Sequence, residues 1–207
     1  MSRDSYSVYH VLSAGLQKQI VVTDLLHDML ICWADTDPSI ATYTVGGPRL
    51  RFFDPKGNER VTRVPLVTTS RVGQVQHWDT TWSTNGADES LASQVKQAHA
   101  QDVGAAYRLF GRSVFESNRI ETKNRKSAQR YLYAGNGVAT EAAECQSLMA
   151  LVDGPQPISK LGLILGRSDA FASLVVLRLW LIGRVVLPMT SSLMQPNWVV
   201  ARRDCVE

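Results

Sequence analysis

Acidic and imidazole side chains lie close together in the sequence at residues 24–28 and again at residues 77–79. The residues concerned are Asp24, His27, Asp28, His77 and Asp79. Carboxylate oxygens are the ligands that Mg²⁺ prefers, at about 2.0–2.1 Å, and a bound metal ion can activate water for hydrolysis. The first chemical hypothesis is therefore metal-dependent hydrolysis, provided that the fold brings these side chains together.

The first half of the sequence predicts alternating helices and strands. Leu26, Leu30 and Trp33 recur at helical spacing, and Asp37-Pro38 ends that helix because proline has no N–H to donate. Residues 1–20 are interpreted as a polar arm with weak helical character. We expect helices at 23–33, 89–101 and 118–133, and strands at 41–45, 49–54, 59–69, 72–80 and 106–110. This alternation is typical of an α/β layer architecture.

Two local patterns refine this scheme. Pro55-Lys56-Gly57-Asn58 is a strong turn signal, so the strands on either side of it are expected to form a hairpin. In the helix expected at 89–101, Leu91, Val95 and Ala98 lie on one apolar face.

The pattern changes after Gly135-Asn136-Gly137, which is typical of a linker. Short helices are expected at 141–151, 158–165 and 169–181, and short strands at 185–187 and 198–201. Pro157 favours the start of the second of these helices, and Ser168 can cap the third. This order predicts a winged helix-turn-helix domain at 136–207, after a first domain at 1–135.

Composition limits the class of protein. The chain has 207 residues, of which 44% are hydrophobic, so it can bury a core. Its richest apolar run, at 174–182, is interrupted by Arg178, and no run reaches the roughly 18 residues of a membrane span. The N-terminus does not resemble a secretion signal, and a cytoplasmic location is expected. Cys32, Cys145 and Cys205 are too far apart to indicate a zinc site or a disulfide framework.

These features together resemble the TnsA-type endonuclease subunit of heteromeric transposases, over residues 22–202. The resemblance depends on Asp37-Pro38-Ser39-Ile40, on Tyr43 and Pro48, on the hairpin through Pro65, and on ASQVKQAHAQDVGAAYRLF at 92–110. It implies an α/β fold with a restriction-endonuclease-like, or PD-(D/E)XK, core followed by the winged helix. It also implies three partners, which are DNA, an integrase-like transposase subunit and an AAA+ ATPase regulator.

The resemblance also places the family's catalytic positions on this sequence. The glutamate upstream of the Asp-Pro aspartate falls on His27, and the aspartate expected after Pro65 falls on Leu66. The ExK pair of the next strand falls on Trp78 and Thr80. None of these four residues is a carboxylate or a lysine, and Leu66 has no lone pair for a metal ion. The resemblance therefore implies a catalytically inactive subunit that uses no metal or other cofactor.

An active nuclease with rearranged ligands is the first alternative. A shift of one residue in register would bring Asp28 or Asp79 to the catalytic centre that the resemblance assigns, where they would hold Mg²⁺. Because side chains alternate along a strand, Trp78 and Asp79 face opposite ways, and only one of them can point at that site. His27 and His77 are interpreted as partly buried histidines without a catalytic role.

Positive charge is concentrated in one segment. Residues 104–130 contain seven Lys or Arg residues and two Glu residues, in a chain whose net charge is +3. The predicted phosphate contacts are Arg119, Lys123, Arg125, Lys126 and Arg130. Cations that neutralise phosphates release counterions, so DNA binding here is expected to be sensitive to salt. A solvated helix face is the alternative interpretation of the same charges.

The helix expected at 169–181 carries one cation, Arg178, and is otherwise largely apolar. A helix that reads a DNA groove presents several polar contact residues, so burial or contact with protein is favoured for this helix. Together with this helix, the resemblance implies a DNA-docking or scaffolding subunit of a transposition complex. The second alternative is a winged-helix DNA-binding regulator that uses the nuclease core for dimerisation.

Overall fold

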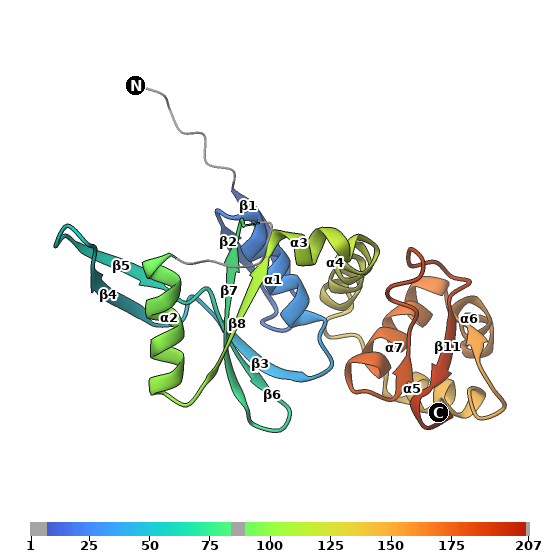
Figure 1. The fold of residues 1–207 in the computed structure, drawn as a ribbon. Helices are drawn as coiled ribbons and strands as arrows, with labels where there is room; N and C mark the ends of the chain where they lie inside the picture. Colours follow the sequence, from blue (N-terminus) through green and yellow to red (C-terminus); the bar gives the residue numbers. More distant parts are fainter. Residues whose placement is uncertain (1–7, 84–89, 206–207) are drawn as a thin grey trace. The chain divides into compact units, whose positions relative to one another are not determined.

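The computed structural model describes residues 8–83 and 90–205 of the chain (Figure 1). Helices and strands alternate along it, and this confirms the expected mixed α/β class. The chain divides into two compact units, which we call the N-terminal unit and the C-terminal unit. They comprise residues 1–11, 19–35 and 39–117, and residues 12–18, 36–38 and 118–207, respectively.

A four-stranded sheet is the centre of the N-terminal unit (Figure 1). The elements in chain order are β1 (Tyr9–Ser13), β2 (Lys18–Val22), α1 (Leu25–Asp35), β3 (Ile40–Val45), β4 (Arg49–Phe53), β5 (Glu59–Arg63), β6 (Leu66–Ser70), β7 (Val75–Thr81), α2 (Leu91–Asp102), β8 (Ala106–Gly111) and α3 (Arg112–Ser117). The strand order of the sheet is β3-β6-β7-β8, and β1 with β2 and β4 with β5 form separate two-stranded sheets.

Strand direction changes once across the sheet. β3, β6 and β7 pair antiparallel, whereas β8 pairs parallel with β7. A parallel pair needs a crossover connection, and α2 provides it. The predicted start of this helix at Glu89 lies outside the described residues, and the described helix begins at Leu91 after the N-cap Ser90.

Register assigns the side chains of β6, β7 and β8 to two faces. Leu66 lies opposite Trp78, and Thr80 lies opposite Phe110, so these residues share one face of the sheet. The ring of Trp33 on α1 packs edge-on against Phe110, with ring centroids 6.1 Å apart, so α1 lies on this side. His77, Asp79 and Tyr107 point to the other face, where α2 lies. The two faces are called the α1 face and the α2 face.

Residues 1–20 were expected to form a polar arm with weak helical character, and for the described residues this is wrong. β1 and β2 form a hairpin in residues 9–22. Val11 and Ser13 of β1 are buried while His10 and Leu12 are exposed, which is the alternation of a strand. The turn places Gln17 at φ 53°, a left-handed conformation without the glycine or asparagine that usually indicates it. The turn was therefore hidden in the sequence.

The single strand expected at 59–69 is two strands that belong to different sheets. β5 pairs with β4, and β6 pairs with β3 and β7. The break lies at Val64 and Pro65, whose carbonyls accept hydrogen bonds from Gly47 and Gly46 at 2.8 Å. Pro65 has no N–H and cannot continue a ladder, so the chain changes partner there.

The C-terminal unit is built mainly of helices around a three-stranded sheet. Its elements are α4 (Arg119–Ala134), α5 (Glu141–Ala150), β9 (Gln156–Pro157), α6 (Ile158–Leu165), α7 (Asp169–Leu181), β10 (Val185–Val186), β11 (Val199–Arg202) and the 3₁₀ turn η1 (Arg203–Cys205). The sheet order is β10-β11-β9, and both pairs are antiparallel. The helices predicted at 158–165 and 169–181 are confirmed at those bounds.

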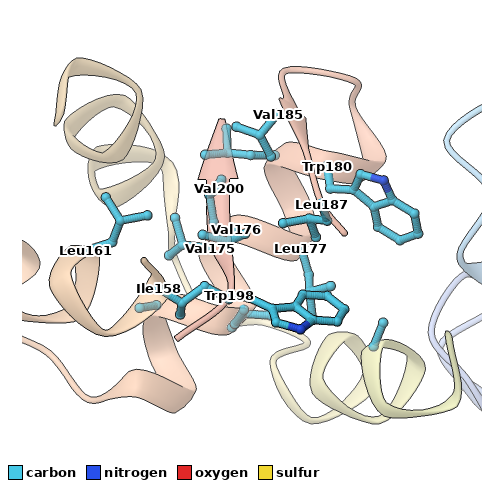
Figure 2. Packing of buried hydrophobic residues seen from close by; sticks show 14 of the residues in the cluster. Ile158, Leu161, Val175, Val176, Leu177, Trp180, Val185, Leu187, Trp198 and Val200 are labelled. Atoms are coloured by element: carbon cyan, nitrogen blue, oxygen red, sulfur yellow. The ribbon is translucent and has the colours of Figure 1, made fainter. Parts of the chain in front are cut away.

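Helix α7 is the centre of the C-terminal core (Figure 2). Val175, Val176 and Leu177 are all within 1% of complete burial, and Ile158 from α6 and Val200 from β11 pack in the same cluster. Ser168 caps the helix by accepting a hydrogen bond from the Phe171 N–H. A helix that is largely apolar has to be buried over most of its surface, and eight of the thirteen residues of α7 are buried.

Helix α4 belongs to the C-terminal unit, although it precedes the predicted boundary at residue 135. Ala128 and Leu132 of α4 are part of the C-terminal core. From residue 118 onwards the chain belongs to the C-terminal unit, which therefore includes α4. The linker signal at Gly135-Asn136-Gly137 is a turn inside the unit.

Gly135 is required where α4 ends against α7. A Cβ atom at this position would lie 2.4 Å from both terminal carbons of Leu174, although φ is −83°, a value that any residue can adopt. We predict that Gly135→Ala lowers the free energy of unfolding by about 1–3 kcal/mol because of this overpacking. Urea unfolding checks it, with Asn136→Ala as the neutral neighbouring control. Leu174→Ala should recover part of the loss, and wild-type stability for Gly135→Ala would contradict this account.

Candidate functional site

The positions that the resemblance assigns to catalysis on β6 and β7 lie side by side in an apolar layer. Leu66 and Trp78 are directly opposite each other in neighbouring strands, and each is only 1% exposed. The Trp78 ring lies 4.9 Å from that of Phe110, which in turn contacts Trp33 and Phe115. The resemblance assigned both residues to the catalytic centre. What they form is part of the core on the α1 face.

A cation covers the edge of this layer. The guanidinium carbon of Arg108 lies 4.5 Å from the Phe110 ring centre and 5.5 Å from that of Trp78. Thr80 lies on the same face and is half-buried. A fixed positive charge over an aromatic layer repels a divalent cation, and an apolar layer offers it no ligands. The layer is therefore suited to packing and not to metal-dependent hydrolysis.

His27, the fourth assigned position, lies half-buried on α1. Burial is the main cause that lowers the pKa of its imidazole below the ordinary value, and it outweighs the opposing charges of Asp24 and Asp79. Burial also lowers the pKa of His77, whose ring stacks on that of His99 with 5.6 Å between the centroids. Both histidines are thereby kept neutral near pH 7, as expected of buried histidines.

Asp79 points to the α2 face and is engaged there in a closed network. Its Oδ2 atom accepts a hydrogen bond from the Tyr107 hydroxyl at 2.7 Å and forms an ion pair with the Lys96 ammonium. Its Oδ1 atom accepts the N–H of Thr80 at 2.9 Å. Ser93 extends the network, because its hydroxyl lies 2.9 Å from that of Tyr107. Both carboxylate oxygens are therefore occupied by internal partners.

Sequence reasoning missed Lys96, Ser93 and Tyr107. Leu91, Val95 and Ala98, which share one face of α2 in the sequence, do not form its buried face, because Leu91 and Ala98 are exposed. The residues of α2 that are buried are Ser93, Lys96 and Ala100. The ion pair with Asp79 determines which face of the helix points inward. A lysine inside a helix gives no signal of this in the sequence, because most lysines are solvated.

The two aspartates proposed as replacement ligands do not form a metal centre with other acidic residues. Asp28 is buried on α1, and Asp79 is buried in the network on the α2 face. Within residues 8–83 and 90–205, no three His, Cys, Asp or Glu side chains gather closely enough to hold a metal ion. Cys32 is buried and Cys145 is exposed, and the side chain of Cys205 lies outside the described part.

Four cations form a line along α4, which we call the basic stripe. They are Arg119, Lys123, Lys126 and Arg130. At 3.6 residues per turn, these positions fall within about 60° of the helix surface and extend over about 16 Å. Three of them are exposed, and Lys126 is half-buried. The stripe contains no acidic side chain, and its exposed members Arg119, Lys123 and Arg130 can contact an anionic partner.

Arg125, the fifth predicted phosphate contact, lies on another side of α4. Its side chain is 11% exposed and forms an ion pair with Glu121 at 2.7 Å. It also donates a hydrogen bond to the Thr36 carbonyl at 2.7 Å, and its guanidinium lies 5.8 Å from the Trp180 ring. An arginine held in this way supports the fold of the C-terminal unit. It is not placed to bind phosphate.

Arg178, the single cation of α7, is likewise used within the unit. Its guanidinium donates hydrogen bonds of 2.9 Å to the carbonyls of Gly135 and Val138, and it also contacts Thr140. Eight of the thirteen residues of α7 are buried. The helix therefore has no polar face with which to read bases.

Comparison with known proteins gives no independent assignment. No protein-family model and no curated protein matches the chain. In the part of the chain that the structure describes, no helix is long and apolar enough to cross a membrane. The function has to be argued from the residues themselves.

The buried pair of Asp79 and Lys96 allows a direct test of its role. We predict that Lys96→Met lowers the free energy of unfolding by about 3–5 kcal/mol, because it leaves a buried carboxylate without its counter-charge. Combining it with Asp79→Asn should restore most of the loss, since Asn carries no charge but keeps hydrogen-bonding atoms there. Lys56→Met, on an exposed turn, is the matched control and should change stability by less than about 0.5 kcal/mol. Equal stability of the Lys96 and Lys56 variants in chemical denaturation would show that the pair is not structural.

Proposed function

We propose that this chain is a catalytically inactive, TnsA-like subunit of a DNA transposition complex. In this role it docks on DNA and acts as a scaffold for an integrase-like transposase and its AAA+ ATPase regulator. The proposal has three supports, which are the order of the elements, the apolar layer at the former catalytic positions, and the basic stripe.

The order of elements in the N-terminal unit supports a PD-(D/E)XK-like core. α1, β3, β6, β7, α2 and β8 follow one another as helix, three antiparallel strands, helix and parallel strand. The resemblance implies a helix, a strand, a hairpin and a further strand pair, and in the structure the hairpin of β4 and β5 is a sheet separate from the central one. In the C-terminal unit, α5, β9, α6, α7, β10 and β11 follow the helix-strand-helix-helix-strand-strand order of a winged helix.

The observation that carries the proposal is the pairing of Leu66 with Trp78. The two strands meet in the register that would place an aspartate beside the ExK pair, and the positions hold buried apolar side chains. Hydrolysis of a phosphodiester needs a metal ion and an activated water, and this layer excludes both. A subunit of this kind contributes binding energy and position to its complex without cleaving DNA.

An active nuclease with rearranged ligands has one observation in its favour. Asp79 and Lys96 are a carboxylate and an ammonium side by side on the α2 face, which are two of the residue types that such an enzyme needs. Both oxygens of Asp79 already accept internal hydrogen bonds. The inactive scaffold is therefore the better supported function.

The winged-helix regulator is the less favoured alternative because α7 is buried. A groove-reading helix needs exposed polar residues, whereas Arg178 is bonded to backbone carbonyls of its own unit. The C-terminal unit is better suited to contacts with protein, and the basic stripe on α4 to contacts with phosphates. A complex that relied on this subunit for cleavage would leave the element joined to donor DNA, unless a second nuclease acted.

DNA docking is tested on the basic stripe. We predict that Lys123→Gln with Arg130→Gln weakens duplex binding to all sequences alike. It should also lower the slope of log K against log salt by up to about 1.8, because two phosphate contacts are lost. The measurement is a titration of labelled duplex at several salt concentrations, followed by fluorescence anisotropy.

The matched control is Lys160→Gln with Arg167→Gln, which removes one lysine and one arginine from exposed positions of the same unit. It should leave the affinity and the slope unchanged. Equal effects of the two double changes would mean that net charge, and not the stripe, attracts DNA. Absence of duplex binding by the unmodified chain would contradict the proposed function as a whole.

A further inference from the structure

The hairpin of β4 and β5, which we call the ribbon, forms a sheet separate from the four central strands (Figure 1). Residues directly opposite each other in an antiparallel pair share a face. The outer face consists of Arg49, Arg51, Phe53, Glu59, Val61 and Arg63, and the inner face consists of Leu50, Phe52, Arg60 and Thr62. The ribbon thus has two faces of different chemistry.

The inner face is anchored and the outer face is open. Leu50, Phe52 and Thr62 are half-buried, and α2 is the helix that lies against the ribbon (Figure 1). All six residues of the outer face are exposed. Phe53 and Val61 are 69% and 60% exposed, although both are apolar. A two-stranded hairpin is marginal in water by itself, so the packing on α2 is what holds the outer face in place.

The outer face has an excess of positive charge. Arg49 and Arg63 are directly opposite each other, and Arg51 forms an exposed ion pair with Glu59 at 3.1 Å. Like charges directly opposite on a ribbon destabilise it, and an exposed ion pair contributes little. An acceptor-rich partner that binds between the two arginines removes this cost. The arrangement is therefore complementary to an anionic ligand.

We infer that the outer face of the ribbon enters the major groove of duplex DNA and contacts guanine bases through Arg49 and Arg63. This inference rests on the proposed function, because it gives the DNA-docking subunit a second contact in addition to the basic stripe. The stripe binds phosphates and does not distinguish sequences, whereas the ribbon adds a preference for guanine. The two contacts lie in different units and are tested separately.

The dimensions and chemistry of the ribbon fit this groove. Five-residue strands are about 17 Å long and lie about 4.8 Å apart, and the major groove, about 12 Å wide, admits a two-stranded ribbon. All the cations of the outer face are arginines, whose planar guanidinium pairs with the N7 and O6 atoms of guanine. Exposed apolar side chains beside them, such as Phe53, can contact the methyl group of thymine.

The test compares Arg63→Gln with Arg60→Gln. Both changes remove one arginine from β5, but Arg63 is on the outer face and Arg60 on the inner face, where it pairs with Asp54 at 3.2 Å. We predict that Arg63→Gln weakens binding to guanine-containing duplexes about tenfold, within the range of one arginine–guanine contact. Arg60→Gln should change it less than twofold. Unfolding curves of both variants verify that the ribbon remains folded.

A second measurement uses the unmodified chain. Duplexes of random sequence, methylated sparsely at guanine N7 in the major groove, are divided into bound and free fractions. The bound fraction should be depleted of methylated guanines, and Arg49→Gln with Arg63→Gln should abolish the depletion. Equal methylation in the two fractions overturns the inference, as does equal binding of an RNA duplex, whose deep, narrow major groove would not admit the ribbon. If stripe variants weaken binding and ribbon variants do not, the ribbon inference alone fails.

Discussion

The register of β6 against β7 is the constraint from which the rest of the N-terminal unit follows. Because side chains alternate along a strand, placing Leu66 opposite Trp78 fixes both on the α1 face and sends His77 and Asp79 to the α2 face. Apolar residues on the first face join the aromatic cluster of Trp33, Phe110 and Phe115. The carboxylate on the second face then needs a partner in a buried place, and Lys96 supplies it. This register therefore places Trp78, at an assigned catalytic position, and the neighbouring Asp79 on opposite faces of the sheet.

The charged side chains fall into two groups: some are bonded within the protein, and others are exposed to an external anion. Arg125 and Arg178 are bonded to carbonyls within the C-terminal unit and hold its elements together. Lys123 and Arg130 of the basic stripe on α4, and Arg49 and Arg63 of the outer face of the ribbon, are exposed cations instead. When packing holds the element in place and the cation is not part of an internal ion pair, the cation can bind an external anion without first breaking an internal contact. This distinction is what supports DNA docking without catalysis.

Local signals in the sequence predicted local structure well. The helices at 158–165 and 169–181 are found at those bounds because Pro157, Gly166 and Ser168 are start and stop signals that act within a few residues. Features that depend on distant partners did not follow. The buried face of α2 is decided by the ion pair with Asp79, the break at Pro65 by which strand each half pairs with, and the affiliation of α4 by its packing on α7. The sequence also did not show that Arg125 is bonded within the protein, whereas Lys123 and Arg130 on the same helix are exposed.

The central claim is that this chain binds DNA but does not cut it, and the conversion of supercoiled plasmid into nicked circles tests it most directly. The purified full chain is incubated with plasmid and Mg²⁺ or Mn²⁺ at concentrations where binding to the plasmid is complete. The account predicts full binding and no nicked product above the level of the metal alone. Metal-dependent nicking that disappears on Asp79→Ala or Asp28→Ala, in variants that still bind DNA, would contradict it and would identify the chain as an active nuclease with rearranged ligands.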